Sequence, residues 1–596
     1  MVDYRGDAIL AAMHPAKSCP LFSESLRISE RFANNVVLTQ PERQTSYSEL
    51  LALVLDVSDN ILAHPPVVVA VVVDDPRNAL FAIWAILACG NAYMPLSGEA
   101  GPLVNAQLIR QCNVRLMVTD RTDFSEIEAD PDYKIQVILL DFDGRAVNQC
   151  NSPEPRVASA SGHYKAYILT TSGTTGTPKL VVQNRANVAF HAQRYGATVG
   201  LAPGVTLTWF AHYGFDAACM DIFGTLLHGA TLICPGFGLR GLVRTPALLS
   251  RSPANVFHST PTVFRALSRS PRSSQIFLSV SYVVFGGEPA FAGDLQTFRL
   301  VCGPSAIHIN GLGPSECSVA LQYRFTMEDA ARFLIEDGSA SRSLPIGRPV
   351  NGIRARTMTD GTGAEELQLE GDGVFVKYLA DAERTDAAFY VDGSIRWYRT
   401  GDLVAYDPAW GYVFRRRRDH AIKVRGQWID PLACAAILRQ DDNVIDAWVM
   451  LDDTASGENQ FLTAFVHFKN NFHVLSPDTL SALPTVASGI RVRHAASVPL
   501  ASNGKLKPQV ADLKREPDFS ELPRGRLTGS SVTTYLLAAE ISVALDDDIF
   551  DAGLDSLTFS DLILYVQQRA GRQLDIDEFL IAPTVRNLLS LLRVDP

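Results

Sequence analysis

Up to residue 400, short β-branched runs alternate with groups of apolar residues at helical spacing. The run VVVAVVV (67–73) is typical of a strand buried on both faces, and residues 78–90 show the spacing of a following helix. Further strands are expected at 114–120 and 134–142, and a strand at 164–173 runs into a loop rich in Gly and Thr. This βαβ rhythm predicts an α/β fold in which helices cover parallel sheets.

The pattern changes after the basic run RRRRD, and four units are expected along the chain. A large α/β core is predicted at 1–416, and a smaller α+β subdomain at 417–515. Residues 516–529 are polar, contain two prolines and are typical of a linker. Apolar residues at three-to-four spacing in 530–596 predict an all-α domain of four helices.

Composition narrows the class of protein. Of 596 residues, 47% are hydrophobic and 20% are charged, which is typical of globular domains with large cores. The net charge of -11 argues against sequence-independent nucleic-acid binding, which needs a basic surface. Nine cysteines show no metal-ligand spacing, and no apolar run is long enough to span a bilayer, so we expect a cytoplasmic protein without a membrane partner.

Residues 170–179 read TTSGTTGTPK directly after a predicted strand. Glycines let backbone N–H groups converge on one anion, the hydroxyls add donors, and the lysine adds positive charge. The spacing is not that of a Walker A loop, and the alternative is a flexible surface loop. The candidate nucleotide-binding residues here are Thr171, Ser172, Gly173, Thr174, Thr175, Gly176 and Lys179.

The segment TSGTTGTPK resembles the signature of the adenylate-forming enzymes, which include nonribosomal peptide synthetase adenylation domains, acyl-CoA synthetases and luciferases. SYSEL (46–50) and CGNAYMPL (89–96) resemble early structural motifs of the same family. Leu180 is a departure, because the family usually has glycine after the lysine. The resemblance implies that ATP and Mg²⁺ are used, and that 1–416 and 417–515 are the two parts of an adenylation domain.

NGLGPSE (310–316) resembles the family's loop that holds adenine and the metal, although an isolated GPSE would more often be a turn. The resemblance implies that Glu316 helps to bind Mg²⁺, a hard cation that prefers carboxylate and phosphate oxygens. The family usually stacks an aromatic residue on adenine where this chain has Leu312. The nucleotide-binding candidates of this loop are Gly311, Leu312, Gly313 and Ser315.

Three later motifs extend the resemblance. Asp402, in YRTGDL, resembles the carboxylate that accepts hydrogen bonds from both ribose hydroxyls. Arg417 lies at the family's ribose- and phosphate-contacting arginine, and Asp419 at the hinge of the mobile small subdomain, while the other arginines of the run are expected to be solvated. Lys505, in SNGK, resembles the lysine that stabilises charge developing on the α-phosphorus.

The segment DDIFDAGLDSL (547–557) resembles the thiolation motif of carrier proteins, so 530–596 would be a peptidyl carrier domain. Its apolar spacing predicts helices at 532–545 and 556–570. Ser556 would receive 4'-phosphopantetheine from a phosphopantetheinyl transferase, and the alternative is a helix-capping serine. Since the sequence ends soon after this motif, we expect the product to pass to a condensation, tailoring or acyltransferase protein in trans.

The segment HYGFDAACMDIF (212–223) resembles the family's substrate helix. Asp216 falls where amino-acid-activating members pair an aspartate with the substrate's α-ammonium, and the alternative is a helix-capping aspartate. The pocket is small-walled and mostly apolar, which predicts a large neutral side chain, with His258 either a polar anchor or a core residue. The predicted substrate-binding residues are Asp216, Ala217, Met220, His258, Val284, Gly286, Gly311, Val319 and Ala320.

These features together predict a ligase that activates an amino acid as its adenylate and loads it as a thioester onto its own carrier domain, in nonribosomal peptide or related secondary metabolite biosynthesis. One rival is a carrier-fused ligase for a non-amino carboxylic acid. A second rival is a non-catalytic scaffold, suggested only by Leu180, Leu312 and Arg416, where the chain departs from the family pattern.

Overall fold

A computed structural model describes most of the chain up to residue 418 and shorter stretches beyond it. The described residues are 20–62, 68–96, 102–122, 135–141, 143–147, 165–171, 179–337, 342–359, 365–418, 422–424, 427–429, 431–441, 443–452, 461–468, 475–476, 479, 490–494, 528–538, 543–547, 549, 562–563, 566, 569–570, 574, 579 and 583–594.

A first, seven-stranded sheet contains the strands that the valine-rich pattern predicts. Five of its strands, β7, β4, β3, β5 and β6, run parallel to one another, and β8 is antiparallel to both of its neighbours, β7 and β18. The predicted strands at 67–73, 114–120, 134–142 and 164–173 are confirmed as β3, β5, β6 and β7. In sheet order the strands are β18 (Lys377–Tyr378), β8 (Lys179–Asn184), β7 (Lys165–Thr171), β4 (Ala92–Pro95), β3 (Val68–Val72), β5 (Leu116–Thr119) and β6 (Gln136–Leu139).

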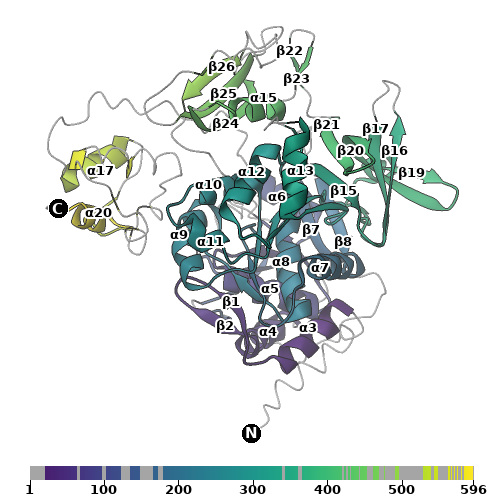
Figure 1. Cartoon of the computed structure of the whole chain (residues 1–596). Coiled ribbons are helices and arrows are strands. Elements are labelled where there is room, and N and C mark those ends of the chain that lie inside the picture. The colour runs from purple at the N-terminus through teal and green to yellow at the C-terminus, as the bar shows by residue number, and fades with distance from the viewer. Residues whose placement is uncertain are drawn as a thin grey trace.

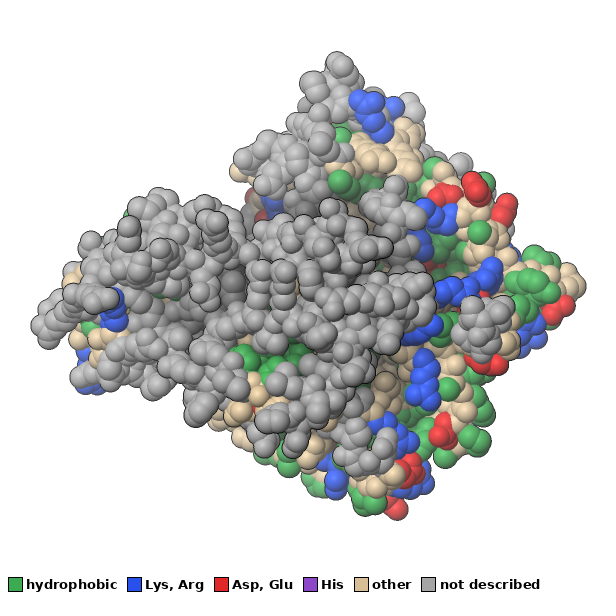
Figure 2. Space-filling model, turned by 90° about the horizontal axis from the view of Figure 1, so that it is seen from above, with side chains coloured by type: hydrophobic (Ala, Val, Ile, Leu, Met, Phe, Trp, Pro, Cys, Tyr) green, Lys and Arg blue, Asp and Glu red, His purple; other side chains and the backbone are tan. Residues whose placement is uncertain are grey.

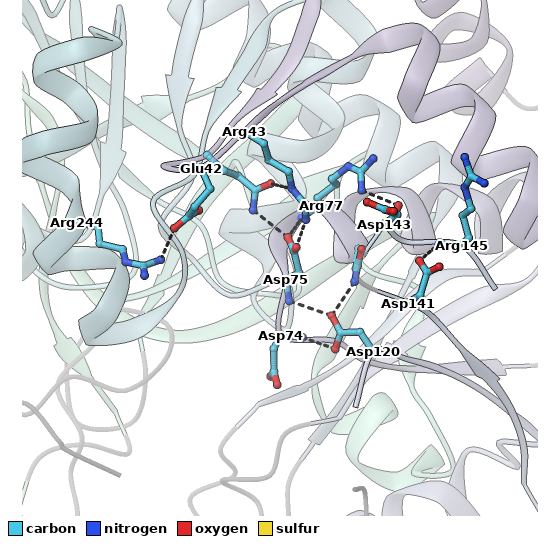
Figure 3. Close-up of polar contacts among 12 residues, drawn as sticks. Glu42, Arg43, Asp74, Asp75, Arg77, Asp120, Asp141, Asp143, Arg145 and Arg244 are labelled. Carbon is cyan, nitrogen blue, oxygen red and sulfur yellow. Dashed lines mark hydrogen bonds and ion pairs between the residues drawn. The ribbon is translucent and has the colours of Figure 1, made fainter. Parts of the chain in front are cut away.

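Carboxylates fix the ends of β3 and β5 to the start of α5 (Pro76–Ala88) (Figure 3). Asp75 caps this helix by accepting a hydrogen bond from the Arg77 backbone. The Asp120 carboxylate, at the end of β5, accepts from the backbone N–H groups of Asp74 and Asp75 at 2.9 and 3.1 Å, and from the Asn78 amide at 2.9 Å. The turn that leads into the helix is therefore held to the neighbouring strand.

A second, 14-stranded sheet is parallel from β1 to β13 and antiparallel beyond. Its strands are β16 (Ile353–Thr359), β17 (Glu365–Gly371), β20 (Ile395–Asp407), β21 (Gly411–Arg417), β15 (Pro345–Pro349), β14 (Leu321–Phe325), β13 (Ile307–Leu312), β12 (Tyr282–Phe285), β11 (Val256–Ser259), β9 (Thr206–Thr208), β10 (Thr231–Ile233), β1 (Val36–Thr39) and β2 (Gln44–Ser46), with β19 (Phe389–Asp392) beside β20.

Helices pack between and around the two sheets (Figure 1). The predicted helix at 78–90 is confirmed as α5, and every residue of it except Arg77 is buried, as expected for a helix that is apolar on all sides. One hydrophobic cluster joins α4, α5, α7 and α8 to strands of both sheets. The core helices are α3 (Pro20–Arg31), α4 (Tyr47–Leu62), α6 (Pro102–Gln111), α7 (Arg185–Val199), α8 (Asp216–His228), α9 (Gly238–Arg251), α10 (Pro261–Ser268), α11 (Ser273–Phe277), α12 (Ala292–Val301), α13 (Met327–Asp337) and α14 (Ala382–Ala387).

Beyond residue 418 two smaller units have hydrophobic clusters of their own (Figure 1). The first contains α15 (Pro431–Leu438), the hairpin of β22 (Ile422–Val424) and β23 (Gln427–Ile429), and a sheet of β24 (Val444–Asp452), β25 (Phe461–Phe468) and β26 (Ile490–His494). The second contains α17 (Gly529–Ala538) and α20 (Val585–Leu591).

The predicted helix at 532–545 is confirmed as α17 up to Ala538, but it does not reach 545, because residues 545–546 form a turn. Contacts with the start of α20 hold this turn in place. The Arg586 backbone donates to the Leu545 carbonyl at 2.8 Å, and the Arg586 guanidinium pairs with Asp546 at 2.5 Å. These contacts take backbone and side-chain groups that a longer helix would have used internally.

In the parts of the chain that are described, no helix is long and apolar enough to cross a membrane. The face seen from above carries Lys and Arg side chains interspersed with Asp and Glu rather than one continuous acidic surface (Figure 2). The excess of acidic residues that gives the net charge of -11 is therefore not spread evenly over the described surface.

His191 on α7 is held as a neutral imidazole. Its Nε2 lies 2.8 Å from the Gly373 carbonyl, and its Nδ1 accepts from the Val319 backbone N–H at 3.2 Å. One nitrogen must therefore donate and the other accept, which the protonated ring cannot do. Burial lowers the pKa of His191 from 6.5 to about 4.

We predict that the protein loses stability as the pH falls from 7 towards 4.5. The folded-state pKa of His191 is below its unfolded value, so the unfolded state takes up the proton first, at a cost of about 1.4 kcal/mol per pH unit below 6.5. Thermal melts of His191→Gln should show a lower Tm at pH 7 and a shallower fall with acid. Parallel pH curves for wild type and variant would contradict this assignment.

Candidate active site

Three neighbouring parallel strands end at the same edge of the second sheet. β11, β12 and β13 are paired in that order, and their carboxyl ends carry His258, Val284 and Gly311. The helix α8 begins opposite them with Asp216. Ligands of open α/β sheets bind at the carboxyl ends of parallel strands, so the topology itself assembles a candidate site here.

A cavity of about 170 Å³ lies at this edge. The cavity wall includes eight of the nine predicted substrate-binding residues, namely Asp216, Ala217, Met220, His258, Val284, Gly286, Gly311 and Val319. The predicted adenine loop contributes Leu312, Gly313 and Ser315 to the same wall. The structure therefore brings together two sets of residues that lie far apart in sequence.

Ala320 is a correction, because it does not line the cavity. It is fully buried in a different hydrophobic cluster, with Cys317 and Leu321. Residues on both sides of it, Val319 and Leu321, line the cavity, so the wall of this segment continues past Ala320 without including it.

Asp216 is the first residue of α8 and does not cap it. The capping position is Phe215, whose side chain makes no capping hydrogen bond. Asp216 is half-buried and lines the cavity. The helix-capping alternative is therefore wrong, and the carboxylate lies where a substrate can reach it.

Asp221 and Tyr195 are among the polar residues of the cavity wall that were not predicted. The Asp221 carboxylate lies 2.6 Å from Nδ1 of His258. Burial alone would lower the pKa of His258, but the adjacent Asp221 carboxylate raises it above its usual value. Helical spacing could have identified Asp221, since it follows Ala217 by four residues and so shares its face of α8.

The candidate phosphate loop leaves β7 after Thr171 and returns to β8 at Lys179, which pairs with Thr171 across the two strands. Residues 172–178, which include Ser172, Gly173, Thr174, Thr175 and Gly176, lie outside the described residues. The Lys179 ammonium lies 5.7 Å from the centre of the Tyr378 ring. Leu180, the departure from the family pattern, is a buried strand residue of the first sheet's core.

Glu316 follows the cavity loop and is buried. Its Oε1 accepts a 2.6 Å hydrogen bond from the Tyr378 hydroxyl, and its carbonyl accepts from the Phe375 backbone at 2.7 Å. Tyr378 thus lies between Lys179 and Glu316, and links the phosphate-loop strands to the adenine loop. Sequence reasoning missed Tyr378, because no motif with recognisable chemistry surrounds it.

The donor set fits a magnesium ion that is shared with nucleotide phosphates. Over the described ranges, no three His, Cys, Asp or Glu side chains are grouped so as to hold a metal ion by themselves. Magnesium in nucleotide sites keeps water and phosphate oxygens and needs only one or two protein carboxylates. Glu316 can supply one such carboxylate.

The two residues that the resemblance assigns to ribose lie opposite each other on neighbouring strands. Asp402 on β20 pairs in register with Arg417 on β21, and Nη1 of Arg417 lies 3.1 Å from Oδ1 of Asp402. Gly401 has a φ of +74°, and a Cβ there would lie 3.3 Å from the same guanidinium. The backbone therefore needs glycine beside the buried carboxylate.

Tyr398 connects this pair to Glu316. It is fully buried on β20, and burial raises its pKa well above the usual value, with further contributions from Glu316, Tyr378 and Asp402. Tyr398 is therefore under the electrostatic influence of both the candidate metal carboxylate and the candidate ribose carboxylate.

Arg418, one of the arginines expected to be solvated, keeps 36% of its side chain exposed and also pairs with a buried carboxylate. Its guanidinium lies 3.1 Å from the buried Glu366 carboxylate, which also accepts from Arg399 and from the Gly401 backbone. A buried carboxylate is costly without cationic partners, which explains the pairing. Asp419, Lys505 and Ser556 lie outside the described residues.

Comparisons with known proteins identify the family. Residues 27–379 match the AMP-binding enzyme family, and residues 532–592 match the phosphopantetheine attachment site. This chain therefore belongs to the AMP-binding enzyme family. The two matches, in this order, correspond to an adenylation domain followed by a carrier domain, the arrangement of nonribosomal peptide synthetases.

Two curated relatives illustrate the similarity. The chain is 25% identical over 543 residues to surfactin synthase subunit 1 of Bacillus subtilis (strain 168), over 88% of this chain and 15% of that protein. It is 27% identical over 409 residues to syringomycin synthase SyrB1 of Pseudomonas syringae pv. syringae, over 66% of this chain and 63% of that protein. The chain thus spans only part of the length of these relatives.

Solved structures share the fold. Klebsiella oxytoca NpsA, in complex with 3-hydroxyanthranilyl-AMSN, superposes with a TM-score of 0.65 at 21% identity, over 83% of this chain and 98% of that one. Holo-AB3403, a four-domain nonribosomal peptide synthetase bound to AMP and glycine, gives a TM-score of 0.64 at 22% identity, over 96% of this chain and 42% of that one. The predicted adenylate-forming fold is therefore confirmed.

We predict that Tyr378→Phe weakens binding of ATP in the presence of Mg²⁺ by about tenfold or more, because a hydrogen bond to a buried carboxylate contributes about 1.5–3 kcal/mol. Calorimetric titration of the full chain with ATP measures this loss. Tyr406→Phe is the matched control, since Tyr406 is an exposed tyrosine on β20. Equal affinities of the Tyr378→Phe variant and wild type would refute a role for Tyr378.

Proposed function

We propose that this protein activates an α-amino acid with ATP as aminoacyl-AMP, and transfers the acyl group to the phosphopantetheine thiol of its own carrier domain. The adenylation core would span 1–416, with the strand β21 continuing to Arg417, and the mobile subdomain 417–515. A linker at 516–529 would join them to the carrier at 530–596. The product would serve nonribosomal peptide or related secondary metabolite biosynthesis.

One observation carries the proposal. Asp216 and the loop of Gly311, Leu312 and Gly313 line a single cavity at the carboxyl ends of three parallel strands. A carboxylate suited to an ammonium group and a loop suited to adenine are thereby placed around one space. Adenylation requires this arrangement, because the substrate carboxylate must attack the phosphorus next to the adenosine.

The nucleotide would be held from two further sides. The Asp402 carboxylate, fixed beside Arg417, would accept from the ribose hydroxyls, and Lys179 with the 172–178 loop would contact the phosphates. Glu316 would hold Mg²⁺, which supplies charge neutralisation on the phosphates when bound. Specific residues of this chain would therefore bind each part of ATP and the Mg²⁺ ion.

The two half-reactions would use different positions of the small subdomain. In the first, Lys505 would stabilise the charge that develops on the α-phosphorus while pyrophosphate departs. A rotation about Asp419 would then withdraw Lys505 and admit the carrier, so that AMP leaves as the acyl group moves to the thiol. Two chemistries could thus share one cavity.

The partners follow from this sequence of events. A phosphopantetheinyl transferase would modify Ser556, at the start of the helix predicted there. The loaded acyl group would then pass to a condensation, tailoring or acyltransferase protein. The chain's similarity to multidomain synthetases supports a partner of this kind.

We predict that Lys505→Ala abolishes ATP–pyrophosphate exchange, because the cation acts only in the transition state of adenylation. Lys507→Ala, two residues along the same segment, is the matched control and should retain exchange. An exchange rate in Lys505→Ala equal to that of wild type would remove Lys505 from the mechanism.

Ser556→Ala should keep pyrophosphate exchange and lose loading, since only the attachment point of the thiol is removed. Intact-mass measurement after treatment with a phosphopantetheinyl transferase should show modification of wild type and of the control Ser560→Ala, but not of Ser556→Ala. Modification of the Ser556→Ala chain would place the attachment elsewhere.

We predict that Asp216→Asn lowers kcat/KM for the amino acid about 10²-fold or more, because removing one partner of a buried ion pair costs about 3–5 kcal/mol. The same variant should lose little with the analogue that lacks the α-amino group. Exchange assays with such a pair, and unchanged ATP affinity as a control, distinguish this function from a ligase for non-amino acids. An equal loss for both analogues would argue for that second function.

A further inference from the structure

A hydrogen-bonded aspartate–histidine pair is built into the wall of the substrate cavity. Asp221 on α8 and His258 at the end of β11 both line the cavity, and their side chains meet at 2.6 Å. Asp221 is 1% exposed and His258 is 9% exposed. The Tyr195 ring packs against the imidazole, with the ring centres 5.3 Å apart. The pair is therefore almost fully removed from water.

The imidazole has a fixed orientation. Nδ1 faces Asp221, and the backbone of His258 exchanges hydrogen bonds with the Thr208 hydroxyl at 2.9 and 3.2 Å. A Cβ added at Gly286, another residue of the cavity wall, would lie 3.8 Å from Nε2. Nε2 therefore points into the space beside Gly286, and within the described chain no residue hydrogen-bonds to it.

The chemistry of the pair defines what Nε2 offers. With Asp221 ionised beside it, the imidazole is stabilised in its protonated form, so both ring nitrogens donate. Nδ1 donates to Asp221, and Nε2 is left to donate into the cavity. The opposite charges cancel within the pair, so the cavity provides a hydrogen-bond donor without a net charge.

A buried ion pair is an unusual wall for a site that selects hydrocarbon. Replacing such a pair with apolar residues is often neutral or stabilising, so apolar selection gives no reason for it. A donor that remains buried without an acceptor also costs free energy, which a hydrocarbon side chain cannot recover. A substrate that brings an acceptor oxygen removes that cost.

We propose that His258, oriented by Asp221, selects a substrate whose side chain places an uncharged oxygen acceptor, such as a hydroxyl or an amide carbonyl, against Nε2. This inference rests on the proposed function, in that the cavity receives the acid to be activated. His258 is then the specificity residue that touches the substrate, and Asp221 is a positioning residue that acts through it. The substrate side chain is then expected to be polar and uncharged instead of apolar.

The test compares isosteric pairs of acids in ATP–pyrophosphate exchange by the full chain. The pairs are valine and threonine, leucine and asparagine, phenylalanine and tyrosine, and benzoate and 2-hydroxybenzoate. A site built to hydrogen-bond an oxygen rejects the analogue that lacks it by large factors. The best substrate should therefore carry the oxygen and exceed its hydrocarbon partner by about 100-fold or more in kcat/KM.

Three variants separate recognition from structural support, with the ratio of kcat/KM within the best pair as the readout. Asp221→Asn keeps the shape but removes the negative charge that favours the protonated imidazole, so the ratio should fall by about tenfold or more. His258→Gln retains a donor and should keep the oxygen preferred, whereas His258→Leu should favour the hydrocarbon. As a control, Tyr406→Phe, at an exposed position of β20 outside the cavity, should leave the ratio unchanged.

The outcomes are distinguishable. Exchange by wild type that is fastest with hydrocarbon members would overturn the inference and leave the proposed function standing, as would an unchanged ratio in Asp221→Asn. A wild type that shows no exchange with any acid, amino or non-amino, would overturn the proposed function and the inference with it.

Discussion

Everything at the candidate site depends on the rule that parallel strands end together. β11, β12 and β13 lie side by side and finish at one edge, so residues from three distant segments of the chain surround one space. The helix α8 closes that space because its first two turns, with Asp216, Ala217, Met220 and Asp221, face the strand ends. Cavity, substrate wall and adenine loop are consequences of this shared edge.

A single tyrosine then joins this edge to the other sheet. Tyr378 belongs to β18 of the first sheet, yet it donates to Glu316, which follows β13 of the second. It also lies beside Lys179, where the phosphate-loop strands meet again. The Phe375 backbone also donates to the Glu316 carbonyl, and the Gln183 amide on β8 donates to the Ser315 carbonyl. Together these bonds set the position of the phosphate-loop strands relative to the adenine loop.

Much of this could be predicted from sequence, because the informative signals were local. The strand at 67–73 and the helix at 78–90 follow from periodicity alone, and the family resemblance located Asp402 and Arg417, which the structure pairs across two strands. Tyr378 and Asp221 were not predicted, because their roles depend on contacts with residues that are distant in the sequence. Ala320 was misassigned for the same reason, since a spacing between motifs does not determine which side of the chain faces a cavity.

The Glu366 carboxylate links the strand β20 to the end of the described core. This buried carboxylate accepts from Arg399 and the Gly401 backbone on β20 and holds Arg418, the last residue described before the chain leaves the core. A displacement of Arg418 would therefore act on Glu366 and, through the Gly401 backbone, on the strand segment that presents Asp402.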